Sequence, residues 1–286
     1  MTHKLGNKIA EGAGSEVYEW DGEHKIVKLA KPNTSIDDLQ QELVNSRVAW
    51  EYGLPVPEPF EFVTIGDRAG IVFERIYGES MLTRLQDGRI GQITESPSSN
   101  VSGDIVEARI TARLLHQVHA HAAPPLRDQR ERLTYDINRA PYLTEADKAS
   151  VIAQLNQLPV KQVLCHGDPN PGNIVIREND AVLIDWNDAS TGNPEADLAE
   201  YVLLIRYATM PEYLNPTPEV KAFLDAAREK LVRTFLDEYK QLTGIGYEDI
   251  EPWFAPVAAR KLSADAFTEA VKASLVEEVR RRIASK

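Results

Sequence analysis

The chain has 286 residues, of which 43% are hydrophobic and 27% charged, a balance typical of a soluble globular protein with one large domain or two coupled lobes. Its formal net charge of −12 disfavours nucleic acid as a partner; the same charge would attract a cationic substrate, although acidity also simply promotes solubility. A single cysteine excludes an internal disulfide, and because the sequence has neither a signal-peptide pattern nor a long apolar stretch, we expect a cytoplasmic protein with no membrane partner.

Short strand-like runs dominate the first quarter of the chain. Five are predicted, at residues 5–10, 16–20, 25–29, 60–65 and 70–76. The pair Asp21-Gly22 predicts a tight turn between the second and third runs. Between the third and fourth runs, Ser35 precedes a stretch with helical spacing of apolar residues, which Gly53 ends.

Helical patterns dominate after Gly78. We predict helices at residues 104–121 and 146–158, and several more from residue 195 onward. Short strands are predicted at residues 162–165, 173–177 and 181–185, and a Ser/Gly/Pro-rich loop at 89–103. The change of character predicts a boundary between an N-terminal domain, residues 1–77, and a C-terminal domain, residues 78–286.

The segment around residues 166–185 carries the most informative motif. Residues 166–173 read His-Gly-Asp-Pro-Asn-Pro-Gly-Asn, an H-x-D-x-x-x-x-N pattern, and an apolar run follows that ends at Asp185. Phosphoryl transfer needs a carboxylate to accept the hydroxyl proton and oxygen ligands to hold magnesium. Asp168 fits the first role. Asn173 and Asp185 fit the second, because a hairpin between them would set both side chains at one edge.

Each of these residues also has a purely structural interpretation. An Asp in a Pro/Gly turn commonly caps the turn, and Asn173 alone fits an Asx turn. His166 fits a packed residue that orients the loop better than it fits a base. The joint pattern is rarely met by chance, and it favours a phosphotransferase.

This pattern, with Ile-Asp-Trp at 184–186 and the run at 192–199, resembles the aminoglycoside phosphotransferase and choline kinase family. The resemblance implies an α+β, protein-kinase-like bilobal fold, with a small antiparallel-sheet N-lobe and a mostly helical C-lobe. It also implies that Asp168 is the catalytic base and that Asn173 and Asp185 bind Mg²⁺. His166 and Asp197 would support the site, with Asp197 binding the backbone of the catalytic loop from the start of a helix. An acidic residue there also stabilises a helix by itself.

The resemblance implies a nucleotide donor, ATP or GTP, bound by the N-lobe. Gly12 and Gly14, in the turn after the first strand, would let backbone N–H groups approach phosphates, and Ser15 would donate a hydrogen bond. The turn departs from the protein-kinase G-x-G-x-x-G-x-V pattern, because Ala10 and Ser15 replace the first and third glycines. Glycines between strands also simply turn the chain.

Lys28, on the third strand, is predicted to meet the α- and β-phosphates, held by Glu42 of the following helix. Glu51 is the alternative partner, and the 3.6-residue period puts it on a different face from Glu42, so only one can serve. A strand lysine that points to solvent is the structural alternative. The resemblance places the hinge at residues 72–76.

In that hinge the Glu74 carbonyl and the Ile76 amide would pair with the adenine edge, and Phe73 would line the pocket or simply pack in the core.

The acceptor is expected to be a small hydroxylated molecule. Protein kinases carry an activation loop after the metal-binding Asp, whereas here only residues 186–196 lie between Asp185 and Asp197. Candidate acceptor contacts are Asn187, Asp188, Glu195, Glu200 and Tyr201, with further acids in 237–251. Carboxylates would suit an amine-bearing acceptor such as an aminoglycoside or choline, and Trp186, Tyr201, Tyr207, Trp253 and Phe254 could cage a quaternary ammonium. Surface acids and core aromatics explain both sets as well.

We therefore expect a small-molecule O-kinase that acts on an antibiotic or on a metabolite of the choline, ethanolamine or sugar type. A non-catalytic nucleotide-binding regulator and a protein kinase are the alternatives. The clustered His116, His119 and His121 fit a helix C-terminus better than a metal site, and Cys165 fits buried packing better than a nucleophile.

Overall fold

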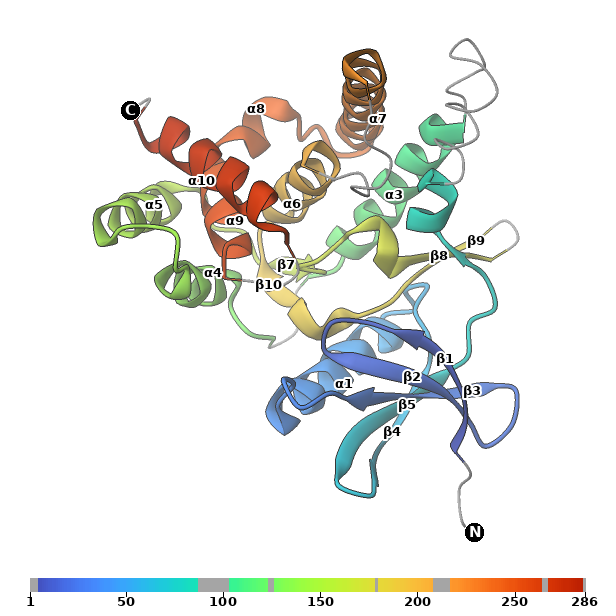
Figure 1. Ribbon diagram of the computed structural model, residues 1–286. Helices are drawn as coiled ribbons and strands as arrows, with labels where there is room; N and C mark the ends of the chain where they lie inside the picture. The colour runs from blue at the N-terminus through green and yellow to red at the C-terminus, as the bar shows by residue number, and fades with distance from the viewer. Residues whose placement is uncertain are drawn as a thin grey trace. The chain divides into compact units, whose positions relative to one another are not determined.

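The computed structural model describes residues 5–86, 103–122, 126–177, 180–207, 217–263 and 267–284. They form two compact units (Figure 1), one within residues 1–81 and 171–189, the other within 82–170 and 190–286. The first is built on an antiparallel sheet and the second is mostly helical, which confirms the predicted α+β fold class. The predicted loop at 89–103 lies outside the described residues, apart from Gly103, where helix α3 begins.

A five-stranded antiparallel sheet in the order β1-β2-β3-β5-β4 forms the frame of the first unit. The strands are β1 (Leu5–Glu11), β2 (Ser15–Trp20), β3 (Lys25–Ala30), β4 (Pro59–Ile65) and β5 (Arg68–Glu74). Asp21 and Gly22, with φ of 47° and 107°, make the turn from β2 to β3, and only a few residue types adopt such angles easily. Helix α1 (Ile36–Glu51) follows β3 and starts at Ser35, whose side chain accepts a hydrogen bond from the Asp38 amide.

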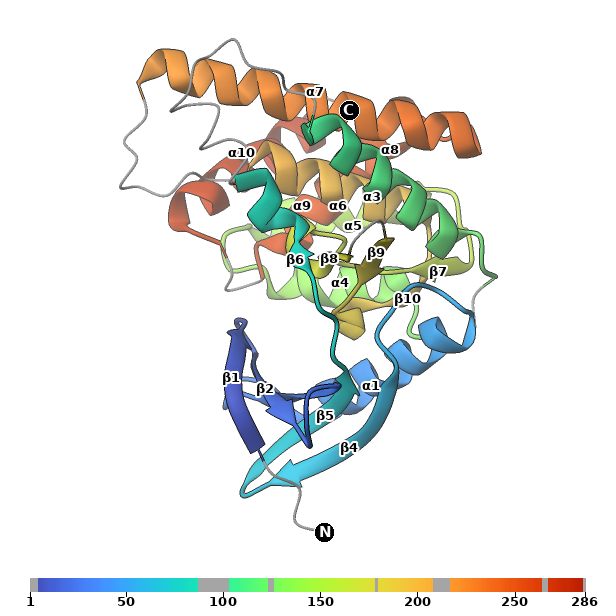
Figure 2. The same cartoon turned by 90° about the vertical axis from the view of Figure 1, so that its right-hand side faces the viewer.

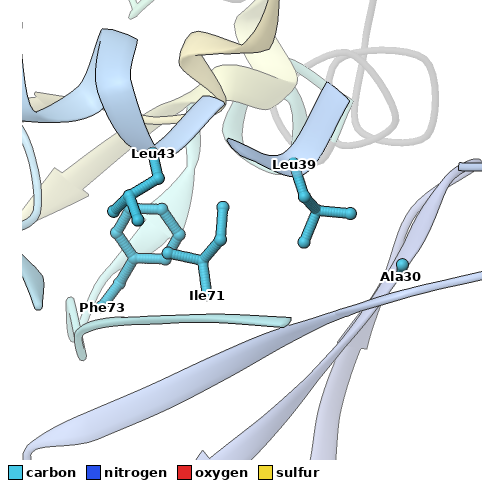
Figure 3. Close-up of a cluster of buried hydrophobic side chains, with 5 residues drawn as sticks. All are labelled: Ala30, Leu39, Leu43, Ile71 and Phe73. Atoms are coloured by element: carbon cyan, nitrogen blue, oxygen red, sulfur yellow. The ribbon is translucent and has the colours of Figure 1, made fainter. Parts of the chain in front are cut away.

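Helix α1 packs on one face of this sheet through a small apolar cluster (Figure 3). It contains Ala30, Leu39, Leu43, Ile71 and Phe73, all buried. Because side chains alternate along a strand, the residues between these on β3 and β5 point to the other face, where Trp20, Val27, Leu29 and Val72 form a second cluster. By the same alternation Lys28 shares the face of Ala30 and is directed toward α1.

Residues 171–189 belong to the first unit, because they pack on α1 and pair with the strand at residues 79–80. Its hairpin consists of β8 (Ile174–Arg177) and β9 (Asp180–Leu183), flanked by the 3₁₀ turns η1 (Pro171–Asn173) and η2 (Trp186–Asp188). Strand β6 (Glu79–Ser80) adds to β8, and η2 packs on α1. A Cβ on Gly78 would stand 2.4 Å from the Ile176 carbonyl oxygen, so β6 can approach β8 only with glycine there.

The second unit is a helical assembly with one short two-stranded sheet. Its elements are α3 (Gly103–His119), α4 (Gln129–Arg139), α5 (Glu145–Gln157), β7 (Val163–Cys165), β10 (Ser190–Gly192), α6 (Pro194–Arg206), α7 (Pro218–Thr243), α8 (Tyr247–Ile250), η4 (Glu251–Trp253), α9 (Phe254–Lys261) and α10 (Glu269–Ala284). Helices α3 and α7 lie side by side (Figure 2). Helix α9 packs against α4, α5, α6 and α10, and all its residues are buried. Among the described helices, none has the length and apolarity that a bilayer span requires.

Candidate active site

Lys28 lies between two carboxylates of the first unit. Its Nζ stands 2.6 Å from Glu42 Oε1 and 2.9 Å from Asp185 Oδ1. Burial alone would lower the pKa of Lys28, but the charges of Asp185 and Glu42 outweigh burial and raise it. Burial raises the pKa of Glu42, and the charge of Lys28 opposes this rise. Glu51, the alternative partner, is exposed at the end of α1. The lysine is therefore a fixed cation.

Asn173 and Asp185 lie at the same end of the β8–β9 hairpin. The register pairs Ile174 with Leu183, and the Ile184 amide donates a 2.9 Å hydrogen bond to the Asn173 carbonyl. Asp185 has a left-handed backbone, with φ 65° and ψ 64°. A non-glycine residue there costs roughly 1–2 kcal/mol, and such residues cluster at functional sites. The carboxylate and amide oxygens at this end are the hard ligands that magnesium prefers, so the donor set fits the metal.

Asn45, a buried residue of α1, holds the turn after Asp185. Its Nδ2 donates to the carbonyl oxygens of Trp186, Asn187 and Ala189 at 2.9, 3.3 and 3.4 Å. This contact braces the strained aspartate against the helix that also carries Glu42. We did not identify Asn45 from the sequence. The available signal was its position three residues after Glu42, on the same helix face.

The glycine turn after β1 is held by the chain that follows β3. The Gly12 amide donates to the Ser15 carbonyl at 2.9 Å, and the Gly14 carbonyl accepts from the Lys31 amide at 2.8 Å and from Thr34 Oγ1 at 2.7 Å. A Cβ on Gly14 would stand 2.6 Å from Thr34 Oγ1, so this close approach requires glycine. The phosphate contacts of Gly12, Gly14 and Ser15 stay predictions.

The expected hinge, residues 72–76, consists of the last three residues of β5 and the two residues after it. Phe73 packs in the apolar cluster under α1, as the core-packing alternative proposes. The Glu74 amide donates to the Glu58 carbonyl at 2.9 Å, and Ile76 is half-buried just after the strand. Pairing of Glu74 and Ile76 with a nucleotide base stays a prediction.

In the second unit, Asp197 at the start of α6 binds the loop that carries Asp168. Its carboxylate accepts hydrogen bonds from the amides of His166, at 2.7 Å, and Gly167, at 3.0 Å. His119 Nε2 lies 3.1 Å from the same carboxylate, and its Nδ1 lies 2.7 Å from the Tyr239 hydroxyl. His119 is thus part of a buried network that fixes the loop.

Asp168 is oriented from three sides. Its amide donates to His166 Nδ1 at 3.2 Å, so this His166 nitrogen is an acceptor. Asn170 Nδ2 donates to Asp168 Oδ2 at 2.8 Å, and Lys261 Nζ donates to Oδ1 at 2.9 Å. Burial would raise the pKa of Asp168, but the Lys261 charge and the Glu200 and Lys261 hydrogen bonds outweigh it and hold the pKa below its ordinary value. Asp168 is therefore ionised.

Of the candidate acceptor contacts in the second unit, Glu200 and Tyr201 are buried. Arg260 Nη1 donates to Glu200 Oε2 at 2.6 Å, and Lys261 pairs with Oε1. Burial raises the pKa of Glu200 to about 8, against the opposing charges of Arg260 and Lys261. The Tyr201 ring packs on Phe235 with ring centroids 4.2 Å apart. A direct contact of either residue with an acceptor stays a prediction.

The other acceptor candidates and the proposed cage aromatics have structural partners as well. Glu195 is buried and pairs with Lys161, while Asn187 and Asp188 are half-buried in η2. Four of the aromatics are fully buried, and the fifth, Tyr207, is half-buried: the buried set is Trp186, Tyr201, Trp253 and Phe254. Cys165 is buried, and burial raises its pKa well above the usual value, so it is a packing residue.

Comparison with known proteins decides the family. The profile of the phosphotransferase enzyme family matches residues 6–252, which is most of the chain. The chain belongs to this family. No curated protein matches the phosphotransferase chain closely enough to be informative.

Solved structures similar to this phosphotransferase family member share its fold at low sequence identity. An aminoglycoside-3'-phosphotransferase of type VIII matches with 18% identity and a TM-score of 0.59, covering 92% of this chain and 94% of that one. The choline kinase LicA from Streptococcus pneumoniae matches with 16% identity and a TM-score of 0.62, covering 99% and 94%. The amicoumacin kinase hAmiN, in complex with AMP-PNP, Ca²⁺ and Ami, matches with 15% identity and a TM-score of 0.62, covering 98% and 87%. At these identities the likeness establishes the fold alone.

Proposed function

We propose that the protein transfers the γ-phosphate of ATP or GTP to a hydroxyl of a small molecule. The observation that carries this proposal is the position of Lys28 between Glu42 and Asp185, at 2.6 and 2.9 Å. A phosphoryl-transfer site uses a fixed cation for the phosphates and an aspartate for the metal. The strained backbone of Asp185 is typical of residues at functional sites. The family match and the kinases crystallised with nucleotide analogues support the same reading.

In this proposal the residues divide the work. Asp168, ionised and oriented by its loop, accepts the proton of the acceptor hydroxyl and holds the oxygen in line. Lys28 binds the α- and β-phosphates, and Asn173 and Asp185 hold Mg²⁺. The metal, when bound, would neutralise charge on the transferred phosphoryl group. Asp197 and His166 keep the catalytic loop in place.

A small acceptor is favoured over a peptide by the short connection after Asp185. Within that connection, η2 and β10 occupy residues 186–192, and α6 starts at Pro194. A peptide-docking activation segment has no length of chain left to form it. The acceptor itself is proposed only as a hydroxylated small molecule, from the antibiotic class or from the choline, ethanolamine or sugar class.

The proposal is tested with the purified full chain, Mg²⁺ and either ATP or GTP. Aminoglycosides and other hydroxylated antibiotics, choline, ethanolamine, sugars and a peptide mixture serve as acceptors. We expect acceptor-dependent release of ADP or GDP and a phosphorylated small molecule by mass spectrometry, lost when EDTA removes the metal. Nucleotide binding without turnover for every acceptor would favour a regulator, and turnover of peptides alone would favour a protein kinase.

Lys28 offers a further prediction on the nucleotide side. Lys28→Met should weaken binding of Mg²⁺–AMP-PNP by roughly ten- to hundredfold, because it removes charge-assisted hydrogen bonds to phosphate. Isothermal titration calorimetry measures the change. Lys25→Met is the matched control, since Lys25 lies on the same strand but packs over the Phe60 ring. Equal losses in both variants would contradict the assignment.

A further inference from the structure

Two adjacent cations of helix α9 reach the loop that carries Asp168. Lys261 Nζ lies 2.9 Å from Asp168 Oδ1 and also pairs with Glu200. Arg260 Nη1 donates to the Gly167 carbonyl and to Glu200 Oε2, both at 2.6 Å. Each cation lies 93 residues further along the chain than the loop residue it contacts. The H-x-D-x-x-x-x-N motif does not predict either of them.

These cations are buried at a considerable cost. Lys261 and Arg260 are each 9% exposed, and a buried charge is tolerated only when partners compensate it. The compensating charges are the carboxylates of Asp168 and, through Arg260 Nε at 3.5 Å, Asp136 of α4. Arg132 of α4 faces the same Asp136, with Nε 3.6 Å away. Helix α9 is held in this cluster by ion pairs that converge on the catalytic loop.

Glu200 links the two cations to Asp168. Its carboxyl is 2% exposed and forms hydrogen bonds with the Asp168 carboxyl, with Arg260 and with Lys261. A hydrogen bond between two carboxyls requires a proton on one of them. The raised pKa of Glu200 and the lowered pKa of Asp168 assign that proton to Glu200. Asp168 then carries the negative charge that Lys261 faces.

We propose that Lys261, anchored by Glu200, is a positioning residue that keeps Asp168 ionised and fixes its Oδ1 for phosphoryl transfer. This inference rests on the proposed function, in which Asp168 is the base. Lys261 and Asn170 donate to different oxygens of the Asp168 carboxylate, Oδ1 and Oδ2, so Lys261 fixes one oxygen and Asn170 the other. Lys261 acts through Asp168 and is not itself a catalytic residue.

Removal of the cation gives a result that a purely structural role does not predict. In Lys261→Met, Asp168 stays buried beside Glu200 but loses its cation. The midpoint of the Asp168 carboxyl titration should therefore rise by roughly one to three pH units. Lys261→Arg keeps the charge and should keep the midpoint low. Lys272→Met is the matched control, because the side chains of Lys261 and Lys272 are both 11% exposed, but Lys272 contacts Glu269 of its own helix and the Tyr142 hydroxyl instead of the catalytic loop.

Two measurements read this out. The first is the ¹³C carboxyl shift of Asp168 against pH in aspartate-labelled full-length protein, assigned by its loss in Asp168→Asn. The second is kcat against pH with the best acceptor from the panel. In Lys261→Met we expect an acid limb within the assay range and a kcat lower by roughly 10²-fold near neutral pH, with little change in the nucleotide KM. Wild type, Lys261→Arg and Lys272→Met should have no such limb.

The outcomes separate this inference from the proposed function. A folded Lys261→Met with an unchanged Asp168 titration and an unchanged kcat profile would overturn the inference alone. If Lys261→Met does not fold, Lys261→Gln carries the same test. Loss of folding in both neutral variants but not in Lys261→Arg would overturn it in favour of a structural role. A shifted titration in a protein that phosphorylates no acceptor would show that Lys261 keeps Asp168 ionised, but it would refute the kinase proposal and with it the role in phosphoryl transfer.

Discussion

Asp168→Asn will reduce phosphoryl transfer by roughly 10²–10⁴-fold while nucleotide affinity stays nearly unchanged. The substitution keeps the size of the side chain and one accepting oxygen, but it removes the carboxylate that accepts the acceptor proton. Lys261 and Asn170 donate to the two oxygens of Asp168, and the single oxygen of the asparagine can still accept from one of them, so the side chain remains held in the loop. Steady-state turnover with the best acceptor, together with calorimetric binding of AMP-PNP, measures both quantities.

Asp180→Asn is the control for this prediction, because Asp180 is exposed at the start of β9 and has no proposed role. It should transfer phosphate at the wild-type rate. If Asp168→Asn also kept its rate, Asp168 would not be the base, whatever acceptor is used. A parallel loss of nucleotide affinity would instead indicate a disrupted loop.

The second large effect concerns stability and the buried Asp197. Asp197→Ala should lower the free energy of unfolding by roughly 2–6 kcal/mol, because it leaves the buried amides of His166 and Gly167 without an acceptor. Urea unfolding followed by fluorescence or circular dichroism measures the loss. The contact between His119 and Asp197 also disappears in this variant.

Asp197→Asn supplies the comparison for this measurement. Its carbonyl oxygen can still accept one of the two amide hydrogen bonds, so its loss of stability should be clearly smaller than that of the alanine variant. Equal stability of Asp197→Ala and wild type would show that the loop does not depend on this carboxylate. A loss of activity without a loss of stability would instead assign Asp197 a chemical role.

Local patterns in the sequence predicted most strands of the five-stranded sheet. The first four predicted strands agree with the structure within one residue at each end. The fifth, predicted at 70–76, runs instead from Arg68 to Glu74. It starts earlier because Arg68 pairs with Ile65 across the β4–β5 turn, and it ends earlier because the Arg75 amide bonds to the His24 carbonyl outside the sheet. Alternation and spacing predict that a strand exists, but they do not predict where its pairing with neighbouring strands begins and ends.

The candidate site divides in the same way. The hairpin that joins Asn173 to Asp185 follows from motif spacing. The pairing of Lys28 with Glu42 was predicted from the kinase pattern, and the helix period showed only that Glu42 and Glu51 could not both serve. The contacts of Asn45 and Lys261 span 141 and 93 residues. For Asn45 the sequence offers only its position on the helix face of Glu42, and for Lys261 it offers no local signal. Helix α4 was not predicted, because most of its eleven residues are charged or polar and only Leu133 and Ile137 mark its apolar face. Such features depend on which helices pack together.

The left-handed backbone of Asp185 has a consequence for how this protein would change under selection. Glycine, and to a lesser degree asparagine, adopts that conformation with little penalty. Either substitution removes one ion pair of Lys28 but leaves its pair with Glu42, so we expect the relief of backbone strain to leave the folded chain as stable or more stable. A library screened only for heat tolerance or soluble yield would therefore enrich glycine or asparagine at position 185. A library screened for phosphorylated product would retain aspartate. The residue recovered at this one position would report which property the screen rewarded.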